Sequence, residues 1–451
     1  MSRFARRACA PAAEETGTVA GLTHAGEGVV HGGKTAFVAG ALPGEVVRFR
    51  RTARHRQHDE AQLLEVISAA PARVQPRCAH FGVCGGCALQ HLEPAAQLAL
   101  KEQQLRENLE RVARVSPERW LPPLTGPVWG YRRRARLGAK FVRKKGRALV
   151  GFRERAAPYV AELERCEVLA APAGGLISPL ARLLDTLAIR EQLPQIEVAV
   201  ADNATALVLR VLASPAAEDL ARLRAFAHAH GVRIYLQTGG LESVVPLEPY
   251  ATALEYRLAP FDLTLAFAPT DFIQVNAAVN AALVARAVEL LAPSPAARVL
   301  DLFCGLGNFT LALARHAQAV VGVEGEAALI ARARANAAAN GLGNAAFHVA
   351  DLCAPVGEFP WMRASYTHVL LDPPRTGARE LLPALAALAP ERLLYISCHP
   401  GSLARDLGVL VHEHGMRLAA AGVVDMFPHT AHVESVALLA AAGSKQRAAS
   451  A

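Results

Sequence analysis

The chain has 451 residues, of which 52% are hydrophobic, and a formal net charge of +8. Its length exceeds one ordinary domain, and no stretch of about eighteen apolar residues occurs, which argues against a transmembrane helix and a membrane partner. The N-terminal residues have no apolar centre typical of a signal peptide, so the eight cysteines indicate metal-binding or catalytic thiols in a cytoplasmic protein rather than a disulfide scaffold.

Residues 14–70 have the pattern of a small β domain. Short alternating stretches such as Gly17-Thr-Val-Ala-Gly are separated by Gly-rich turns, and five such strands would close into a barrel. The segment from His24 to Glu45 resembles the TRAM domain, an OB-like barrel fused to RNA-modifying enzymes, although other Gly-rich β modules share its composition. Basic runs at 48–56 and 132–147 favour nucleic acid as the partner over a merely solvated surface.

Three cysteines follow the barrel in the spacing Cys78-x5-Cys84-x2-Cys87, and Cys166 is the natural candidate for a fourth ligand. Four thiolates suit zinc and an iron-sulfur cluster equally well by their softness. Structural zinc more often joins two close CxxC halves, so the spacing favours the cluster weakly. Both metals stay open on the residues alone.

An amphipathic helix is predicted between Glu93 and Val115, where Leu98, Leu105, Leu109 and Val112 recur at helical spacing. An α+β segment then extends from about residue 120 to residue 269. From Asn276 onward, helices alternate regularly with apolar strands, which predicts a parallel sheet covered on both faces. We expect its strands at 298–303, 319–324, 346–350, 367–371 and 392–397.

A tight glycine turn after the first of these strands is the candidate cofactor loop. Asp301 begins it, Gly305 and Asn308 lie within it, and Glu324 ends the next strand, where a carboxylate can accept hydrogen bonds from ribose hydroxyls. A dinucleotide oxidoreductase would share these features, but Thr310 stands where its third glycine belongs.

Asp351 and Asp372 follow the next two strands. The arrangement resembles the Rossmann-like methyltransferases that use S-adenosyl-L-methionine. The resemblance implies that Glu324 binds the ribose and that Asp351 lies near the adenine. The full set of cofactor residues that it implies is Gln274, Phe303, Gly305, Asn308, Glu324, Asp351 and Asp372.

The C-terminal motifs Asp372-Pro-Pro-Arg375, Ser397-Cys398-His399-Pro400 and His432-Val-Glu434 resemble those of RNA uracil-C5 methyltransferases, as does Phe272-Ile-Gln274-Val-Asn276. Uracil C5 is a poor nucleophile until a thiolate adds at C6. The resemblance therefore implies Cys398 as the nucleophile, Glu434 as the base that removes the C5 proton, and Asp372 in the substrate pocket.

Two details of these motifs bear on the alternatives. An amino-methyltransferase needs no thiol and normally has an aromatic residue after its acidic-Pro-Pro loop, where this chain has Arg375. Family members usually carry Asn where this chain has His399, which leaves the nucleophile in place but changes the hydrogen bonding of its loop.

The barrel, the cysteine triple and the distant Cys166 together are similar to the bacterial 23S rRNA uracil methyltransferase branch. This resemblance implies a 4Fe-4S cluster on Cys78, Cys84, Cys87 and Cys166, with zinc as the alternative. It also implies an enzyme, a 23S rRNA (uracil-C5)-methyltransferase, that modifies large-subunit ribosomal RNA at a site of the uracil(1939) type. A tRNA uracil-C5 methyltransferase and a nonenzymatic iron-sulfur RNA-binding protein are the competing hypotheses.

We expect three domains in a monomer that binds RNA and not DNA. Residues 13–72 would form the TRAM domain, residues 73–270 an α+β central domain with the cysteine cluster, and residues 271–443 the Rossmann-like domain. The helix near 93–120 is expected to pack on the catalytic domain.

Overall fold

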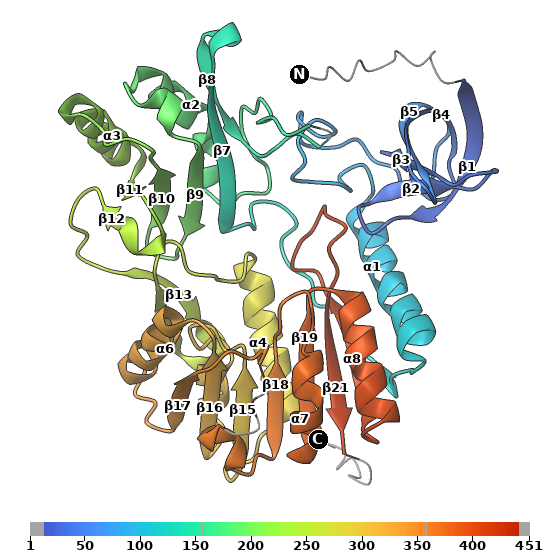
Figure 1. The fold of residues 1–451 in the computed structure, drawn as a ribbon, viewed down its shortest axis with the longest axis vertical. Coiled ribbons are helices and arrows are strands. Elements are labelled where there is room, and N and C mark those ends of the chain that lie inside the picture. The colour runs from blue at the N-terminus through green and yellow to red at the C-terminus, as the bar shows by residue number, and fades with distance from the viewer. Residues whose placement is uncertain (1–12, 156, 355, 357–358, 442–451) are drawn as a thin grey trace, which may run out of the picture. The chain divides into compact units, whose positions relative to one another are not determined.

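The computed structural model describes residues 13–155, 157–354, 356 and 359–441 (Figure 1). The chain forms two compact units: Met1–Gln97, Glu154–Ala157 and Pro428–His432 in the first, and Leu98–Arg153, Pro158–Phe427 and Val433–Ala451 in the second. The N-terminal segment considered as a signal peptide lies outside the described residues, and the division into three domains stays a prediction. No helix within the described ranges has the length and apolarity needed to cross a membrane.

The first unit contains the predicted five-stranded closed barrel. Its strand order is β1-β2-β3-β5-β4, with β3 and β5 parallel. Alternate residues of these strands point inward, and Val38, Val47 and Phe49 are among those that form the barrel core. The strands are β1 (Glu14–Leu22), β2 (Glu27–Val30), β3 (Ala36–Ala39), β4 (Val46–Arg54) and β5 (Asp59–Ser68).

Acidic residues pair with the basic run on β4. Arg51 donates to Glu15 at 2.8 Å and to Asp59 at 3.0 Å, and Arg50 donates to Glu14 at 2.9 Å. Much of the positive charge that the sequence places on this strand is therefore balanced within the barrel itself.

The second unit begins with a helix and a mixed sheet. The sheet order is β12-β11-β10-β9-β7-β8, and a separate hairpin, β13 (Leu254–Leu258) with β14 (Leu263–Phe267), follows it. The sheet strands and the helices beside them are β7 (Arg134–Val142), β8 (Arg147–Gly151), α2 (Ile177–Thr186), β9 (Gln195–Val200), β10 (Thr205–Arg210), α3 (Ala217–His230), β11 (Val232–Gln237) and β12 (Val244–Pro246).

An eight-stranded sheet forms the C-terminal part of the second unit, and its strands β15 to β19 and β21 are labelled in Figure 1. Its order is β17-β16-β15-β18-β19-β21-β20-β6. The five strands from β17 to β19 are parallel, as predicted. The sheet elements and their helices are α4 (Ala277–Leu291), β15 (Arg298–Leu302), α5 (Thr310–Ala314), β16 (Ala319–Glu324), α6 (Ala327–Ala339), β17 (Ala345–Val349), β18 (His368–Leu371), α7 (Leu382–Ala387), β19 (Arg392–Ser397), α8 (Pro400–His412), β20 (Arg417–Val424) and β21 (Glu434–Ala440).

Three strands of this sheet were not expected from the sequence. The antiparallel strands β20 and β21 extend it beyond β19, and β6 (Arg119–Trp120), which precedes the whole domain in the chain, pairs in parallel with β20. The α/β sheet therefore includes a strand from more than 170 residues before its first parallel strand in the chain.

The helix predicted between Glu93 and Val115 ends earlier and changes form. α1 (Pro94–Asn108) continues into a π-helical turn, Leu109–Ala113. Leu105, Leu109 and Ala113 are buried in the core of the α/β sheet. Val112, expected on the buried face, is 52% exposed, because the wider π turn brings Ala113 to that face instead.

The remaining short 3₁₀ segments connect these elements. They are Arg143–Lys145, Ala173–Leu176, Arg190–Gln192, Leu241–Ser243, Ala259–Phe261, Pro360–Arg363 and Arg379–Leu381.

Candidate active site

Three of the catalytic and cofactor-binding residues predicted from the sequence lie at one edge of the α/β sheet. Glu324 ends β16, Asp372 follows β18 and Cys398 follows β19, and these strands are parallel. The carboxyl ends of parallel strands lie at the same edge, and the strand order reverses between β15 and β18. A crevice at such a reversal is the usual ligand site of an open α/β sheet.

The loop after β15 has a backbone conformation that lets a ligand approach it closely. Phe303, Gly305 and Gly307 have positive φ angles of 64°, 54° and 97°. The Glu324 carboxylate accepts hydrogen bonds from the amides of Gly305 at 3.2 Å and Gly325 at 2.7 Å. Glu324 Oε1 also accepts from the amide of Glu326 at 3.2 Å, so the second lone pair of Oε2 is left to accept from a ribose hydroxyl.

Asn308 is held by side chains from two other elements. The Tyr256 hydroxyl donates to Asn308 Oδ1 at 3.0 Å, and Asn280 on α4 exchanges two hydrogen bonds with Asn308, at 3.0 and 2.9 Å. The hairpin β13–β14 and helix α4 therefore fix the glycine loop from outside the parallel sheet.

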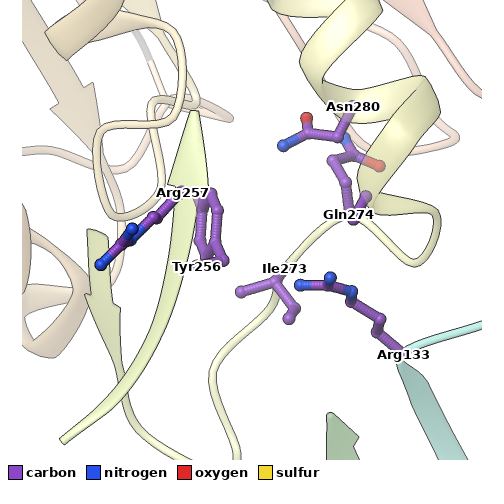
Figure 2. Close-up of a pocket in the computed structure, with 7 residues that line it drawn as sticks. Arg133, Tyr256, Arg257, Ile273, Gln274 and Asn280 are labelled. Atoms are coloured by element: carbon purple, nitrogen blue, oxygen red, sulfur yellow. The ribbon is translucent and has the colours of Figure 1, made fainter. Parts of the chain in front are cut away.

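Gln274 lies beside this network, in a narrow pocket lined by Arg133, Tyr256, Arg257, Ile273, Ala277 and Asn280 (Figure 2). The pocket volume is about 10 Å³, roughly the space of one water molecule. Gln274 and Asn280 thus present amide groups next to the cofactor loop. Arg133 directly precedes β7 of the mixed sheet.

Asp351 and Asp301 lie at the same sheet edge in different surroundings. Asp351 is exposed and accepts from the amide of Cys353 at 2.9 Å. Asp301 is fully buried and accepts from the hydroxyl of Thr310. Burial raises the pKa of Asp301 to about 7, which is the environment of a carboxyl group that is easily protonated near neutral pH.

Cys398 is half-buried between β19 and α8, and its neighbours are acidic. Ser397 pairs with Ser435 across β19 and β21, so Cys398 and Glu434 occupy adjacent strand ends. Burial raises the pKa of the Cys398 thiol, and Glu434 and Asp372 add to the rise, whereas Arg375 opposes it. The thiol is therefore mainly protonated at neutral pH, and its attack on a substrate requires loss of that proton.

The two acids nearest the thiol favour their neutral forms. Burial and the negative charge of Asp372 raise the pKa of Glu434 to about 8, whereas Lys101 acts in the opposite direction. Burial raises the pKa of Asp372 to about 7. Glu434 is 5% exposed, and its Oε2 atom has no hydrogen-bond partner among the described residues. Carboxylic acids with such pKa values can exchange protons near neutral pH.

His399 forms the start of helix α8 directly after the nucleophile candidate. Its Nδ1 atom accepts from the amide of Ser402 at 3.1 Å, which is an N-cap hydrogen bond. An Asn side chain makes the same bond through Oδ1. The imidazole of His399 thus performs the local hydrogen bonding that Asn would supply.

The four predicted metal ligands are divided between the two units. Cys78, Cys84 and Cys87 belong to the first unit and Cys166 to the second. Within the described part of the chain, no group of three or more His, Cys, Asp or Glu side chains is arranged to hold a metal ion. The metal site thus stays a prediction.

Several residues at the site were not identified from the sequence. Tyr256 and Asn280 orient Asn308 by hydrogen bonds. They lie apart from Asn308 in the chain, and no sequence motif links them to it. Lys101 and Asp425 form a buried ion pair at 2.6 Å. Lys101 did carry a signal, because it interrupts the apolar face of the helix between Leu98 and Leu105.

The chain is similar in sequence to a known family and to curated proteins. Residues 255–442 match the family model described as tRNA (Uracil-5-)-methyltransferase. The 23S rRNA (uracil(1939)-C(5))-methyltransferase RlmD of Alkalilimnicola ehrlichii is 53% identical, over 93% of this chain and 95% of that protein. The protein of the same name from Stenotrophomonas maltophilia is 50% identical, over 92% of this chain and 95% of that protein.

A solved structure has the same fold at low sequence identity. It is the Pyrococcus abyssi tRNA (uracil-54, C5)-methyltransferase in complex with S-adenosyl-L-homocysteine, with a TM-score of 0.74 and 24% identity. The likeness covers 94% of this chain and 99% of that chain.

Proposed function

Since the chain belongs to the RlmD family of 23S rRNA (uracil(1939)-C(5))-methyltransferases, we propose that it methylates C5 of that uridine in 23S rRNA. The methyl donor would be S-adenosyl-L-methionine. The observation that carries the proposal is the placement of Cys398 and Glu434 on adjacent strand ends beside the glycine loop. A thiol and a buried carboxylate in this relation suit addition to a pyrimidine ring and later removal of a proton from it.

The cofactor would lie at the glycine loop. Glu324 is anchored there with a lone pair of Oε2 left for the ribose, and the positive φ angles at Gly305 and Gly307 let the backbone approach a ligand. When bound, the cofactor supplies an electrophilic methyl group. We assign its binding to Gln274, Phe303, Gly305, Asn308, Glu324, Asp351 and Asp372.

The chain's own residues carry the covalent steps. Cys398 Sγ gives up its proton to solvent and bonds to C6, which moves the ring's electron pair onto C5 and the carbonyl. After methylation, C5 carries both a methyl group and a hydrogen. Glu434 then takes that hydrogen as a proton, the C5–C6 double bond reforms, and the C6–S bond breaks. Asp372, half-buried near both groups, would hold the uracil edge.

We propose further that Cys78, Cys84, Cys87 and Cys166 bind a 4Fe-4S cluster, with zinc as the alternative. The first three lie in one short loop, where the amide of Cys84 donates to His80 O at 3.0 Å and the amide of Gly86 donates to Cys84 Sγ at 3.4 Å. An amide directed at sulfur stabilises a thiolate ligand. The soft four-sulfur set supports either metal.

The partners follow from the same proposal. The five-stranded barrel would act as an OB-like TRAM domain on ribosomal RNA, and the enzyme would work in the cytoplasm as a monomer. Flipping of the target base out of its stack would bring it to Cys398.

The covalent mechanism is tested with an RNA fragment that contains 5-fluorouridine at the target. Fluorine cannot leave as a proton does, so the wild-type protein with S-adenosyl-L-methionine should form an adduct with RNA that survives denaturation. Cys398→Ala should form none. The matched control is Cys353→Ala, because Cys353 is exposed. An adduct with Cys398→Ala, or none with the wild type, would contradict the mechanism.

Two further measurements test the substrate and the metal. Mapping of 5-methyluridine in 23S rRNA and tRNA from a deletion strain should show loss in the 23S rRNA alone; loss in tRNA favours the tRNA enzyme.

Anaerobic purification should give about four irons and four sulfides per chain. Cys84→Ser should lose them and Cys353→Ser should keep them. Zinc in their place would replace the cluster in the proposal.

A further inference from the structure

Lys101 on α1 is a lysine inside an apolar core. It is 2% exposed, and it lies between Leu98 and Leu105 on the helix face that packs against the α/β sheet. Lysine is almost never buried to this extent unless its charge is paired. Its position thus requires a specific partner inside the protein.

The ammonium group has two hydrogen-bond acceptors in the structure. Its Nζ atom lies 2.6 Å from Asp425 Oδ1 and donates to the carbonyl of Phe427 at 2.9 Å. An ammonium group has three N–H donors, so one remains beyond these two bonds. Lys101 therefore has the capacity to act on a third group nearby.

Asp425 lies next to the proposed base. It follows Val424, and Val424 pairs with Glu434 across β20 and β21. Glu434 is buried at that pair, and its Oε2 atom has no hydrogen-bond partner among the residues that the structure describes. A buried cation and an unsatisfied buried carboxylate oxygen thus occur at the same strand ends.

We propose that Lys101 is a positioning residue for the proposed base: its charge favours the ionised form of Glu434, the form that can accept the C5 proton and release the product. The inference rests on the proposed function, since it presumes that Glu434 removes this proton. It adds a residue outside the catalytic motifs, on a helix that precedes them by almost 300 residues.

The electrostatics of the neighbouring groups support this role. Burial and Asp372 raise the pKa of Glu434, and Lys101 lowers it. Burial lowers the pKa of Lys101, whereas Asp425 and Glu434 raise it. Cys398 also faces this cluster, and the charge of Glu434 raises the pKa of its thiol. Among these groups, Lys101 provides the positive charge that favours an ionised Glu434.

The consequence for the reaction is specific to its last step. If Glu434 stays protonated, the methylated adduct keeps its C5 hydrogen, and the C6–S bond cannot break by elimination. The earlier addition of Cys398 is not slowed by this change, because a neutral Glu434 no longer disfavours the thiolate. Loss of the Lys101 charge should thus trap the covalent complex.

The test uses an RNA fragment with ordinary uridine, the full-length protein and S-adenosyl-L-methionine. Lys101→Met, which keeps the length of the side chain, should turn over at least about tenfold more slowly, the effect of one pKa unit. It should also accumulate a protein–RNA complex that survives denaturation. The release rate should recover as the pH rises, and Lys101→Arg should restore release in part.

A matched variant changes the same ion pair in the opposite direction. Asp425→Asn removes the carboxylate that shares the charge of Lys101, while the amide oxygen can still accept its hydrogen bond, so the pH dependence of release should move toward acid. Trapped complex in Lys101→Met together with this opposite shift supports the inference. An unchanged pH profile in Asp425→Asn contradicts it, even if Lys101→Met fails to fold.

Other outcomes separate this inference from the proposed function. Equal loss of adduct formation and release in a folded Lys101→Met shows a structural role and overturns the inference. If wild-type protein gives no adduct with 5-fluorouridine RNA, the proposed function fails first. If that adduct forms and Lys101→Met releases its product at the wild-type rate, the positioning role alone is rejected.

Discussion

At the scale of single residues, His399 shows how a substitution can keep a function through different atoms. The Nδ1 atom of the imidazole accepts from the amide of Ser402, the bond that an Asn cap would make. The departure from the usual family residue therefore preserves the start of α8 and the backbone that follows Cys398. The cap requires a neutral ring, because a protonated ring has no acceptor.

We expect His399→Asn to leave the free energy of unfolding near the wild-type value at pH 8, whereas His399→Ala should lower it by about 1 kcal/mol, the value of a lost N-cap. Urea unfolding measures both. Equal stability of the Ala and Asn variants would show that the cap contributes nothing.

The buried carboxyl group of Asp301 predicts how the stability of the protein changes with pH. Its pKa is about 7 in the folded protein and 3.8 as the ordinary value. The folded state thus holds a proton that the unfolded chain releases, and a rise in pH from about 4 to 7 favours unfolding. Relative to Asp301→Asn, the wild type should lose up to about 1.4 kcal/mol of stability per pH unit in this range. Urea unfolding of the wild type and of Asp301→Asn at several pH values in this range tests the prediction. A rise in the stability of the wild type relative to Asp301→Asn with increasing pH would contradict it.

At the scale of elements, close packing of strands holds the cofactor loop in place. Gly322 on β16 has no room for a side chain: a Cβ atom would lie 2.8 Å from the Phe347 ring and 3.0 Å from Cys304 Sγ. β16 and β17 can therefore approach the glycine loop closely, and Glu324 reaches the amide of Gly305.

Gly322→Ala should lower stability by about 1–3 kcal/mol, the usual cost of overpacking. It should also weaken binding of S-adenosyl-L-homocysteine, because Glu324 lies two residues further on. Gly343→Ala is the matched control, since its added Cβ atom meets nothing within 4 Å. Calorimetry of ligand binding and urea unfolding would test both, and equal effects of the two variants would refute the packing argument.

At the scale of the whole molecule, the net charge of +8 gives less direct information than its distribution. Many cations of the basic runs are paired with acids: Arg51 with Glu15 on the barrel, and Arg143 with Glu191 between two 3₁₀ segments of the second unit. Exposed pairs of this kind are weak and can exchange for phosphate. Lys144, at the exposed turn between β7 and β8, has no ion pair among the described residues and is therefore ready for a phosphate contact.

Lys144→Ala should weaken binding of a 23S rRNA fragment and reduce the slope of log K against log salt by about one, as for the loss of one phosphate contact. Arg224→Ala, on α3, is a suitable control, because Arg224 is paired with Glu248. Titrations at several salt concentrations measure the slopes. The same slope for wild type and Lys144→Ala would exclude the turn from the RNA interface.

The sequence by itself determined the barrel, the parallel strands and the strand-end acids, because alternation and glycine turns are local patterns. The strand ends around Asp372 and Cys398 were predictable for the same reason. The tertiary structure alone decided that β6 joins the sheet, that a π turn exposes Val112, and that Lys101 and Asp425 meet beside Glu434. These features depend on pairing and burial between segments that are distant in the chain, and a charge on an apolar helix face gains its partner only when the sheet packs against it.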